Sequence, residues 1–148
     1  MLLDPMQSEC ELHQKEFVCR EAGERRIYRV INPNGEFEVR KYRLDGNLVK
    51  NEMCCDFTVI NDTSKMVYYV ELKGRDVGRA VEQLLAGEKI CRGELPEYIS
   101  FYRIIASKSP TTRTEPKNFR NLKEKVGRKR FICKTDGYEE KLIKREDI

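Results

Sequence analysis

The chain has 148 residues, of which 39% are apolar and 36% are charged, with six cysteines and a single histidine. This size and composition predict one globular domain over residues 1–148. No stretch reaches the roughly 20 apolar residues that a membrane-spanning helix needs, and Met1–Pro5 is too short for a signal peptide. We therefore expect an intracellular, cytoplasmic protein whose cysteines are free thiols.

The N-terminal segment predicts a helix. Ser8-Glu9-Cys10-Glu11 has the serine–glutamate spacing of a capping box, and helix-forming residues continue to about Arg20. Glu16 would lie on this helix near the border of its buried face. An ordinary surface glutamate is the alternative for that position.

Two strands are expected next. Residues 26–31 alternate between apolar and polar side chains, and the turn formers Asn32–Gly35 follow them. Residues 36–44 resume a period of two, with Phe37 and Val39 on the apolar side. This pattern predicts that the chain returns as a half-buried strand.

Residues 55–60 and 65–74 predict a β-hairpin around a polar turn at 61–64. Centring the turn between Thr63 and Ser64 places Asp56 opposite Glu71. Like charges on directly opposed strand residues, roughly 5 Å apart, destabilise a sheet unless a positive group lies between them. A divalent cation is the natural candidate.

Strand alternation puts a third polar side chain beside this pair. Lys73 lies two residues beyond Glu71 and therefore on the same face of its strand as Glu71 and Asp56. Phe57 and Val59 point to the opposite face, which predicts a core. The alternative is that the three polar residues are only surface groups at a strand end.

The second half of the chain predicts a helix, a strand, a helix and a strand. Apolar residues at helical spacing predict a helix over 75–90, and the apolar run 98–106 predicts a central strand beside that of Glu71, reached by a right-handed crossover. A short helix over 118–126 and a last strand over 128–134 follow, and the charged end is expected to be loose. The fold class is therefore α/β, with a central mixed sheet of about four to six strands flanked by helices.

The C-terminal region carries the positive charge. Residues 108–145 contain 13 Lys plus Arg and 5 Asp plus Glu, a local charge of +8 within a chain of net charge +4. Such an excess favours a polyanionic partner, although a solvated charged surface is the plain alternative. The residues expected to bind a nucleic-acid backbone are Lys117, Arg120, Lys123, Arg128, Lys129 and Arg130.

Asp56 followed by Glu71-Leu72-Lys73 at the end of the next strand resembles the PD-(D/E)XK nuclease superfamily, over about residues 54–85. Cys55 stands where the superfamily's name has a proline. The resemblance implies a restriction endonuclease-like or Holliday junction resolvase-like core. It also implies Mg²⁺, with Mn²⁺ as a substitute, bound by Asp56, Glu71 and the Leu72 carbonyl.

The resemblance also assigns roles around the metal. Glu16 would complete the ligands, Lys73 would orient the attacking water or stabilise developing charge, and Gln83 on the following helix would point toward the site. An ordinary exposed glutamine is the alternative for Gln83. The products implied are a 5′-phosphate and a 3′-hydroxyl.

The expected function is that of an Mg²⁺-dependent endonuclease that hydrolyses phosphodiester bonds. DNA is favoured over RNA because most relatives in that superfamily act on DNA, and a homodimer would suit cleavage of both strands of a duplex. Two alternatives stay open at this point. One is a non-catalytic module of the same fold that binds nucleic acid or a protein, and the other is an RNA-cleaving toxin or defence effector.

Overall fold

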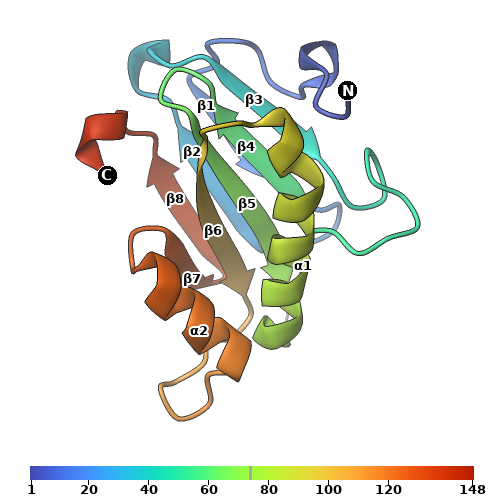
Figure 1. Cartoon of the computed structure of the whole chain (residues 1–148), viewed down its shortest axis with the longest axis vertical. Coiled ribbons are helices and arrows are strands. Elements are labelled where there is room, and N and C mark those ends of the chain that lie inside the picture. Colours follow the sequence, from blue (N-terminus) through green and yellow to red (C-terminus); the bar gives the residue numbers. More distant parts are fainter. Residues whose placement is uncertain (74) are drawn as a thin grey trace.

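Two sheets and two α-helices make up the described part of the chain, which in this computed structural model comprises residues 1–73 and 75–148 (Figure 1). The larger sheet has the strand order β3 (Val39–Arg43), β4 (Phe57–Asn61), β5 (Met66–Lys73), β6 (Ile99–Ala106) and β7 (Phe131–Thr135). The smaller sheet has the order β1 (Glu16–Cys19), β2 (Ile27–Ile31) and β8 (Gly137–Lys141). The expected α/β class with a mixed sheet is confirmed, whereas the second sheet was not foreseen.

The helices connect or cover these strands. α1 (Val77–Cys91) links β5 to β6, and α2 (Lys117–Val126) links β6 to β7. Short 3-10 turns lie at Pro5–Gln7, Pro33–Gly35, Arg92–Glu94 and Arg145–Asp147. Within the described residues, no helix has the length and apolar character needed to cross a membrane.

The predicted hairpin register is confirmed. Ile60 lies opposite Val67 and Phe57 lies opposite Val70 in the antiparallel β4–β5 pair, so the ladder continues directly to Asp56 and Glu71. β5 then pairs in parallel with β6, and β6 with β7, as the predicted crossover requires. The sheet is therefore antiparallel on one side of β5 and parallel on the other.

Both faces of this sheet are covered. Val67 and Tyr69 pack with Ala80 and Leu84 of α1, while Tyr68 and its neighbours pack against the three-stranded sheet. The face that carries Glu71 is thus a core face along most of the hairpin, like the predicted Phe57 face. Leu85 of α1 does not take part in this packing and is 41% exposed.

The predicted helix over Ser8–Arg20 is wrong. Residues 8–15 instead run along the edge of β3, where the Glu9 N–H donates to the Lys41 carbonyl (2.8 Å) and the Val39 N–H donates to the Leu12 carbonyl (2.8 Å). The Ser8 hydroxyl accepts from the Lys41 N–H (3.1 Å) and so does not cap a helix. The segment satisfies the edge strand's backbone groups, which local helix propensity does not reveal.

The C-terminal end is also more ordered than expected. β7 starts three residues later than predicted, and β8 then pairs in parallel with β2. Glu140 of β8 binds the guanidinium of Arg103 on β6 through both of its oxygens, at 2.7 and 2.8 Å. This ion pair ties the smaller sheet to the larger one.

Candidate active site

The larger sheet brings Asp56 and Glu71 together at one end of the β4–β5 hairpin. Asp56 immediately precedes β4 and Glu71 lies near the end of β5, and because the strands are antiparallel these positions meet. The Asp56 N–H donates to Glu71 Oε1 (3.1 Å), and the Leu72 N–H donates to Asp56 Oδ2 (2.9 Å). Each carboxylate therefore accepts a backbone N–H from the opposite strand.

Burial makes both carboxyl groups weak acids, and the charge of Asp56 adds to this effect at Glu71. Glu71 is only 2% exposed, and its burial, followed by the charge of Asp56, raises its pKa to about 9. Burial likewise raises the pKa of Asp56 to about 6, against the opposing effect of the Leu72 N–H. Two carboxyl groups held this way gain from a nearby cation.

Lys73 supplies positive charge at the same end of the hairpin. It is the last residue of β5, is half-buried, and its charge lowers the pKa of Glu71. Leu72 lies between these two residues, with its side chain in the core that faces the smaller sheet. The structure thus brings together three of the predicted residues, Asp56, Glu71 and Lys73.

Glu16 does not join them, which corrects the predicted metal ligand. It begins β1 and forms an ion pair with Arg29 of β2. The expectation depended on a helix that would turn Glu16 toward the hairpin. In the extended strand, Glu16 lies at the start of β1. Glu21, whose charge acts on Asp56, follows the other end of β1.

Two acidic residues that sequence reasoning missed lie close to Asp56. The charges of Glu21 and Asp45 both raise its pKa. Asp45 follows β3, and its N–H donates to the Cys55 carbonyl (3.2 Å), which continues the β3–β4 register. That register is the pattern from which the position of Asp45 beside Asp56 could have been predicted. Glu21 lies in a loop, held by Arg43 (2.6 Å), and no sequence pattern marks it.

Gln83 lies on α1 as expected. Its Oε1 atom is buried and has no hydrogen-bond partner in the described part of the chain. An orphaned buried acceptor costs free energy unless a water or a ligand donates to it. Among the described residues, no hydrogen bond joins this oxygen to Asp56 or Glu71.

The donor set suits a hard cation only in part. Carboxylate oxygens are the ligands that Mg²⁺ prefers, and this ion is commonly bound through one or two carboxylates together with waters and substrate phosphate. Asp56 and Glu71 meet that requirement. Across residues 1–73 and 75–148, no group of three or more His, Cys, Asp or Glu side chains is arranged to hold a metal.

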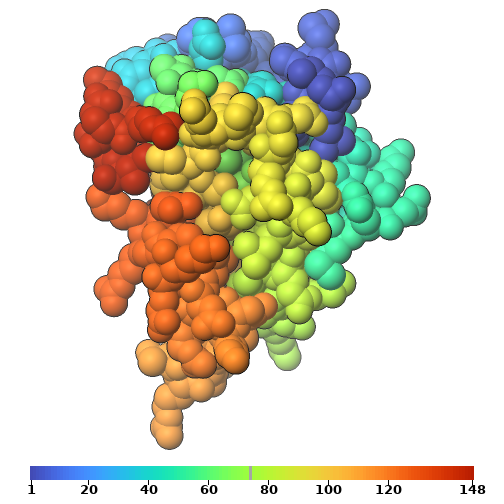
Figure 2. Space-filling view, viewed as in Figure 1, coloured from blue at the N-terminus to red at the C-terminus, as the bar shows by residue number. Residues whose placement is uncertain are grey.

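The predicted nucleic-acid contacts lie on and after α2. Lys117, Arg120, Arg128 and Lys129 are exposed. Lys123 instead pairs with Glu115, and the Arg130 Nε donates to the Ser100 carbonyl (2.9 Å), so both have structural partners. Figure 2 shows α2 beside α1 on one face of the molecule.

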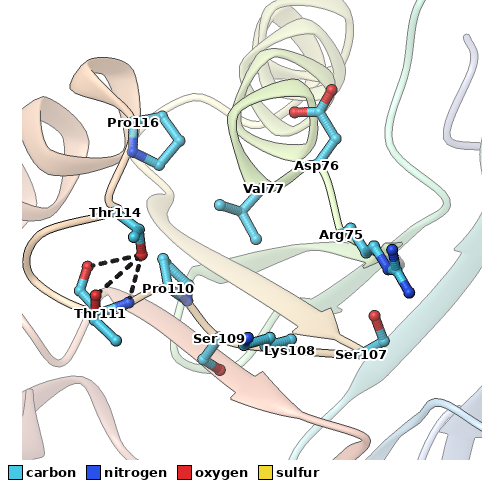
Figure 3. Close-up of a pocket in the computed structure, with 10 residues that line it drawn as sticks. All are labelled: Arg75, Asp76, Val77, Ser107, Lys108, Ser109, Pro110, Thr111, Thr114 and Pro116. Carbon is cyan, nitrogen blue, oxygen red and sulfur yellow. Dashed lines mark hydrogen bonds between the residues drawn. The ribbon is translucent and has the colours of Figure 1, made fainter.

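A cavity of about 760 Å³ opens beyond the ends of β5 and β6 (Figure 3). Two connections form it, the one that leads into α1 and the one that leads from β6 to α2. Its lining residues are Arg75, Asp76, Val77, Ser107, Lys108, Ser109, Pro110, Thr111, Thr114 and Pro116. The cavity is thus separated from Lys73 by only one residue of the chain.

Comparison of the chain with models of protein families, with curated proteins and with solved structures finds no match. The functional interpretation therefore depends on the residues and their geometry.

Proposed function

We propose that the chain is a metal-dependent endonuclease of the PD-(D/E)XK type that hydrolyses phosphodiester bonds, with DNA favoured as substrate. The observation that supports this most directly is the carboxyl pair of Asp56 and Glu71, joined across the β4–β5 ladder with Lys73 beside it.

Such a pair is hard to explain as a stabilising feature. Buried carboxyl groups lose hydration, and two of them repel one another when ionised, so apolar residues here would give a more stable sheet. An arrangement that costs stability is often kept for chemistry. The raised pKa values of both groups express this cost.

The residues divide the work as follows. Asp56, Glu71 and the Leu72 carbonyl would hold Mg²⁺ or Mn²⁺, which when bound supplies an activated water and offsets negative charge on the phosphodiester. Lys73, at the open end of β5, donates to the attacking water or to the developing charge on the phosphate. α1 keeps bulk water away from the rest of that face.

The exposed cations provide for substrate binding. Lys117, Arg120, Arg128 and Lys129 lie on or just beyond α2, where they can neutralise backbone phosphates and release counterions. This contact would be independent of base sequence.

A non-catalytic nucleic-acid-binding module is the second candidate. The observation that favours it is the set of exposed cations on and after α2, which needs no metal to bind a phosphate backbone. Such a module would keep the basic surface and lack hydrolysis. An RNA-cleaving effector differs from the main proposal only in its substrate.

Incubation of the purified protein with plasmid DNA, linear duplex DNA, single-stranded DNA and transfer RNA distinguishes these candidates. Each reaction is run with Mg²⁺, Mn²⁺ or EDTA, and 5′-phosphate ends are assayed on the products. We expect metal-dependent cleavage that leaves 5′-phosphates. Binding to any of these nucleic acids without cleavage under every condition would favour the module.

A further inference from the structure

The cavity lies just beyond the carboxyl end of β5, the strand that carries Glu71 and Lys73. Lys73 pairs with Ala106, and the next residue on that strand, Ser107, lines the cavity together with Arg75. Ligands of open α/β sheets commonly bind outside the carboxyl ends of the parallel strands, which is the edge that opens here. In Figure 3, Arg75 and Ser107 lie at one end of the cavity, and Thr111, Thr114 and Pro116 lie at the other.

Part of the cavity wall is apolar, and hydrogen bonds fix the loop that carries much of it. Val77, Pro110 and Pro116 provide apolar surface. The Thr114 hydroxyl accepts from the Thr111 N–H (2.8 Å) and thereby fixes the loop. The Ser109 hydroxyl also contacts that of Thr135 on β7 (2.9 Å), so the loop is attached to the sheet.

Two cations accompany this apolar surface in the lining. Arg75 and Lys108 line the cavity and form no ion pair with the described residues. The one acidic residue in the lining, Asp76, accepts the Arg79 N–H (2.9 Å) as the N-cap of α1. A ligand with an apolar planar part and a negative charge fits this distribution.

We propose that this cavity holds one unpaired nucleotide of the substrate strand, with its base against Val77, Pro110 and Pro116 and a phosphate at Arg75 and Lys108. The cavity volume lies within the range of small-molecule sites. A base inside a duplex is stacked and cannot enter such a cavity without being extruded. The substrate class is therefore single-stranded nucleic acid, or a duplex with unpaired nucleotides at the cut.

The position of this nucleotide next to the cut rests on the proposed nuclease function, whereas its binding does not require cleavage. Binding is therefore measured first, in EDTA, by fluorescence anisotropy. The two labelled probes are a single-stranded 12-mer and a hairpin with the same number of nucleotides, which forms a duplex stem. A second series replaces one nucleotide at a time in the single strand by an abasic residue. We expect the single strand to bind about tenfold more tightly than the duplex, and one abasic position to weaken binding about tenfold.

Variants of the protein identify the cavity as the place of binding. Arg75→Ala and Lys108→Ala should weaken single-strand binding about fivefold or more, and Pro110→Ala should reduce the penalty of the abasic position. Lys50→Ala and Lys89→Ala remove exposed lysines elsewhere and should leave the affinity unchanged. Equal binding of single strand and duplex, or the same affinity at every abasic position, would overturn the proposal.

Cleavage of the same oligonucleotides with Mg²⁺ separates the two proposals. Abasic sensitivity without cleavage of any substrate would support the nucleotide cavity and count against the nuclease. Cleavage without any abasic effect would support the nuclease and overturn the nucleotide cavity.

Discussion

The Asp56 N–H donates a 3.1 Å hydrogen bond to Glu71 Oε1, and Asp56 Oδ2 in turn accepts the N–H of Leu72, the residue after Glu71. The two side chains are therefore held by the backbone that carries them. Their positions do not depend on a flexible loop, because they continue the β4–β5 ladder. A cation that binds between them would meet two oriented carboxylates.

Removing any one of the three polar side chains at this end of the β4–β5 hairpin should stop catalysis. Asp56→Asn, Glu71→Gln and Lys73→Ala should each lower the rate of phosphodiester cleavage by about 100-fold or more, because charge stabilisation at the phosphate is lost. Glu82→Gln and Lys89→Ala change exposed residues on α1 and serve as controls. Single-turnover cleavage, together with circular dichroism of each variant, tests this. Wild-type rates in all three variants would end the assignment of the site.

Glu71 should make the protein less stable as the pH rises. Its pKa is about 9 in the folded state, against the ordinary glutamate value of 4.5, so above pH 4.5 the unfolded state loses a proton that the folded state keeps. The free energy of unfolding should therefore fall between pH 4.5 and 9. Glu71→Gln removes this dependence and should be more stable than the wild type at pH 8, by on the order of 2 kcal/mol.

Urea unfolding of both proteins at pH 5, 6.5 and 8 measures this difference. Glu82→Gln, an exposed carboxylate, should follow the wild-type curve. The prediction fails if Glu71→Gln and the wild type differ by the same amount at all three values of pH.

Gly87 of α1 should resist substitution because the helix there approaches Cys55, the residue before Asp56. A Cβ atom at this position would lie 2.5 Å from Cys55 Sγ, closer than real contacts allow. Gly87→Ala should therefore cost about 1–3 kcal/mol, the usual cost of overpacking a core. At Gly93 a Cβ atom meets nothing within 4 Å, so Gly93→Ala is the matched control.

The double variant Gly87→Ala with Cys55→Ala tests the cause. Removing the sulfur makes room for the new methyl group, so the two substitutions together should cost less than the sum of their separate effects. Additive effects in chemical denaturation would show that the clash is not the reason.

Arg103 should be the most costly charged residue to replace. It is 1% exposed, and besides binding both Glu140 oxygens it donates to the carbonyl of Lys129 (3.0 Å). Arg103→Met would leave the largely buried Glu140 carboxylate with only the Tyr28 hydroxyl as a donor from this core, which costs about 3 kcal/mol. Arg103→Met with Glu140→Gln should recover part of this loss. Arg25→Met, which breaks an exposed ion pair, should change stability by less than about 0.5 kcal/mol.

The cations after α2 should determine how salt affects nucleic-acid binding. Arg128→Ala with Lys129→Ala removes two exposed charges, and each lost phosphate contact lowers the slope of log affinity against log salt by roughly 0.7–0.9. The slope should therefore decrease by about 1.5. The control, Lys50→Ala with Lys89→Ala, should keep the wild-type slope when the affinity is measured from about 50 to 200 mM salt. An unchanged slope in the first variant would place the binding surface elsewhere.

Much of the larger sheet could be predicted from the sequence because its signals are local. Alternating strands around a short polar turn set the β4–β5 register, and that register alone placed Asp56 opposite Glu71. Helical spacing likewise predicted α1, and Gly127, at a φ of 87°, ends α2 as expected. These patterns depend on residues that are close together in the chain.

The tertiary structure decided what depends on distant partners. Residues 8–15 became the cover of the β3 edge, because unpaired backbone groups there outweigh a local capping signal. β8 forms because it pairs with β2 and because its residue Glu140 binds Arg103. No local pattern in the charged C-terminal sequence reveals either contact. The sequence by itself determined the paired carboxylates, through a ladder between neighbouring strands. Only long-range packing decided that Glu16 would leave them, that Glu21 and Asp45 would approach, and that a cavity would open beside Lys73.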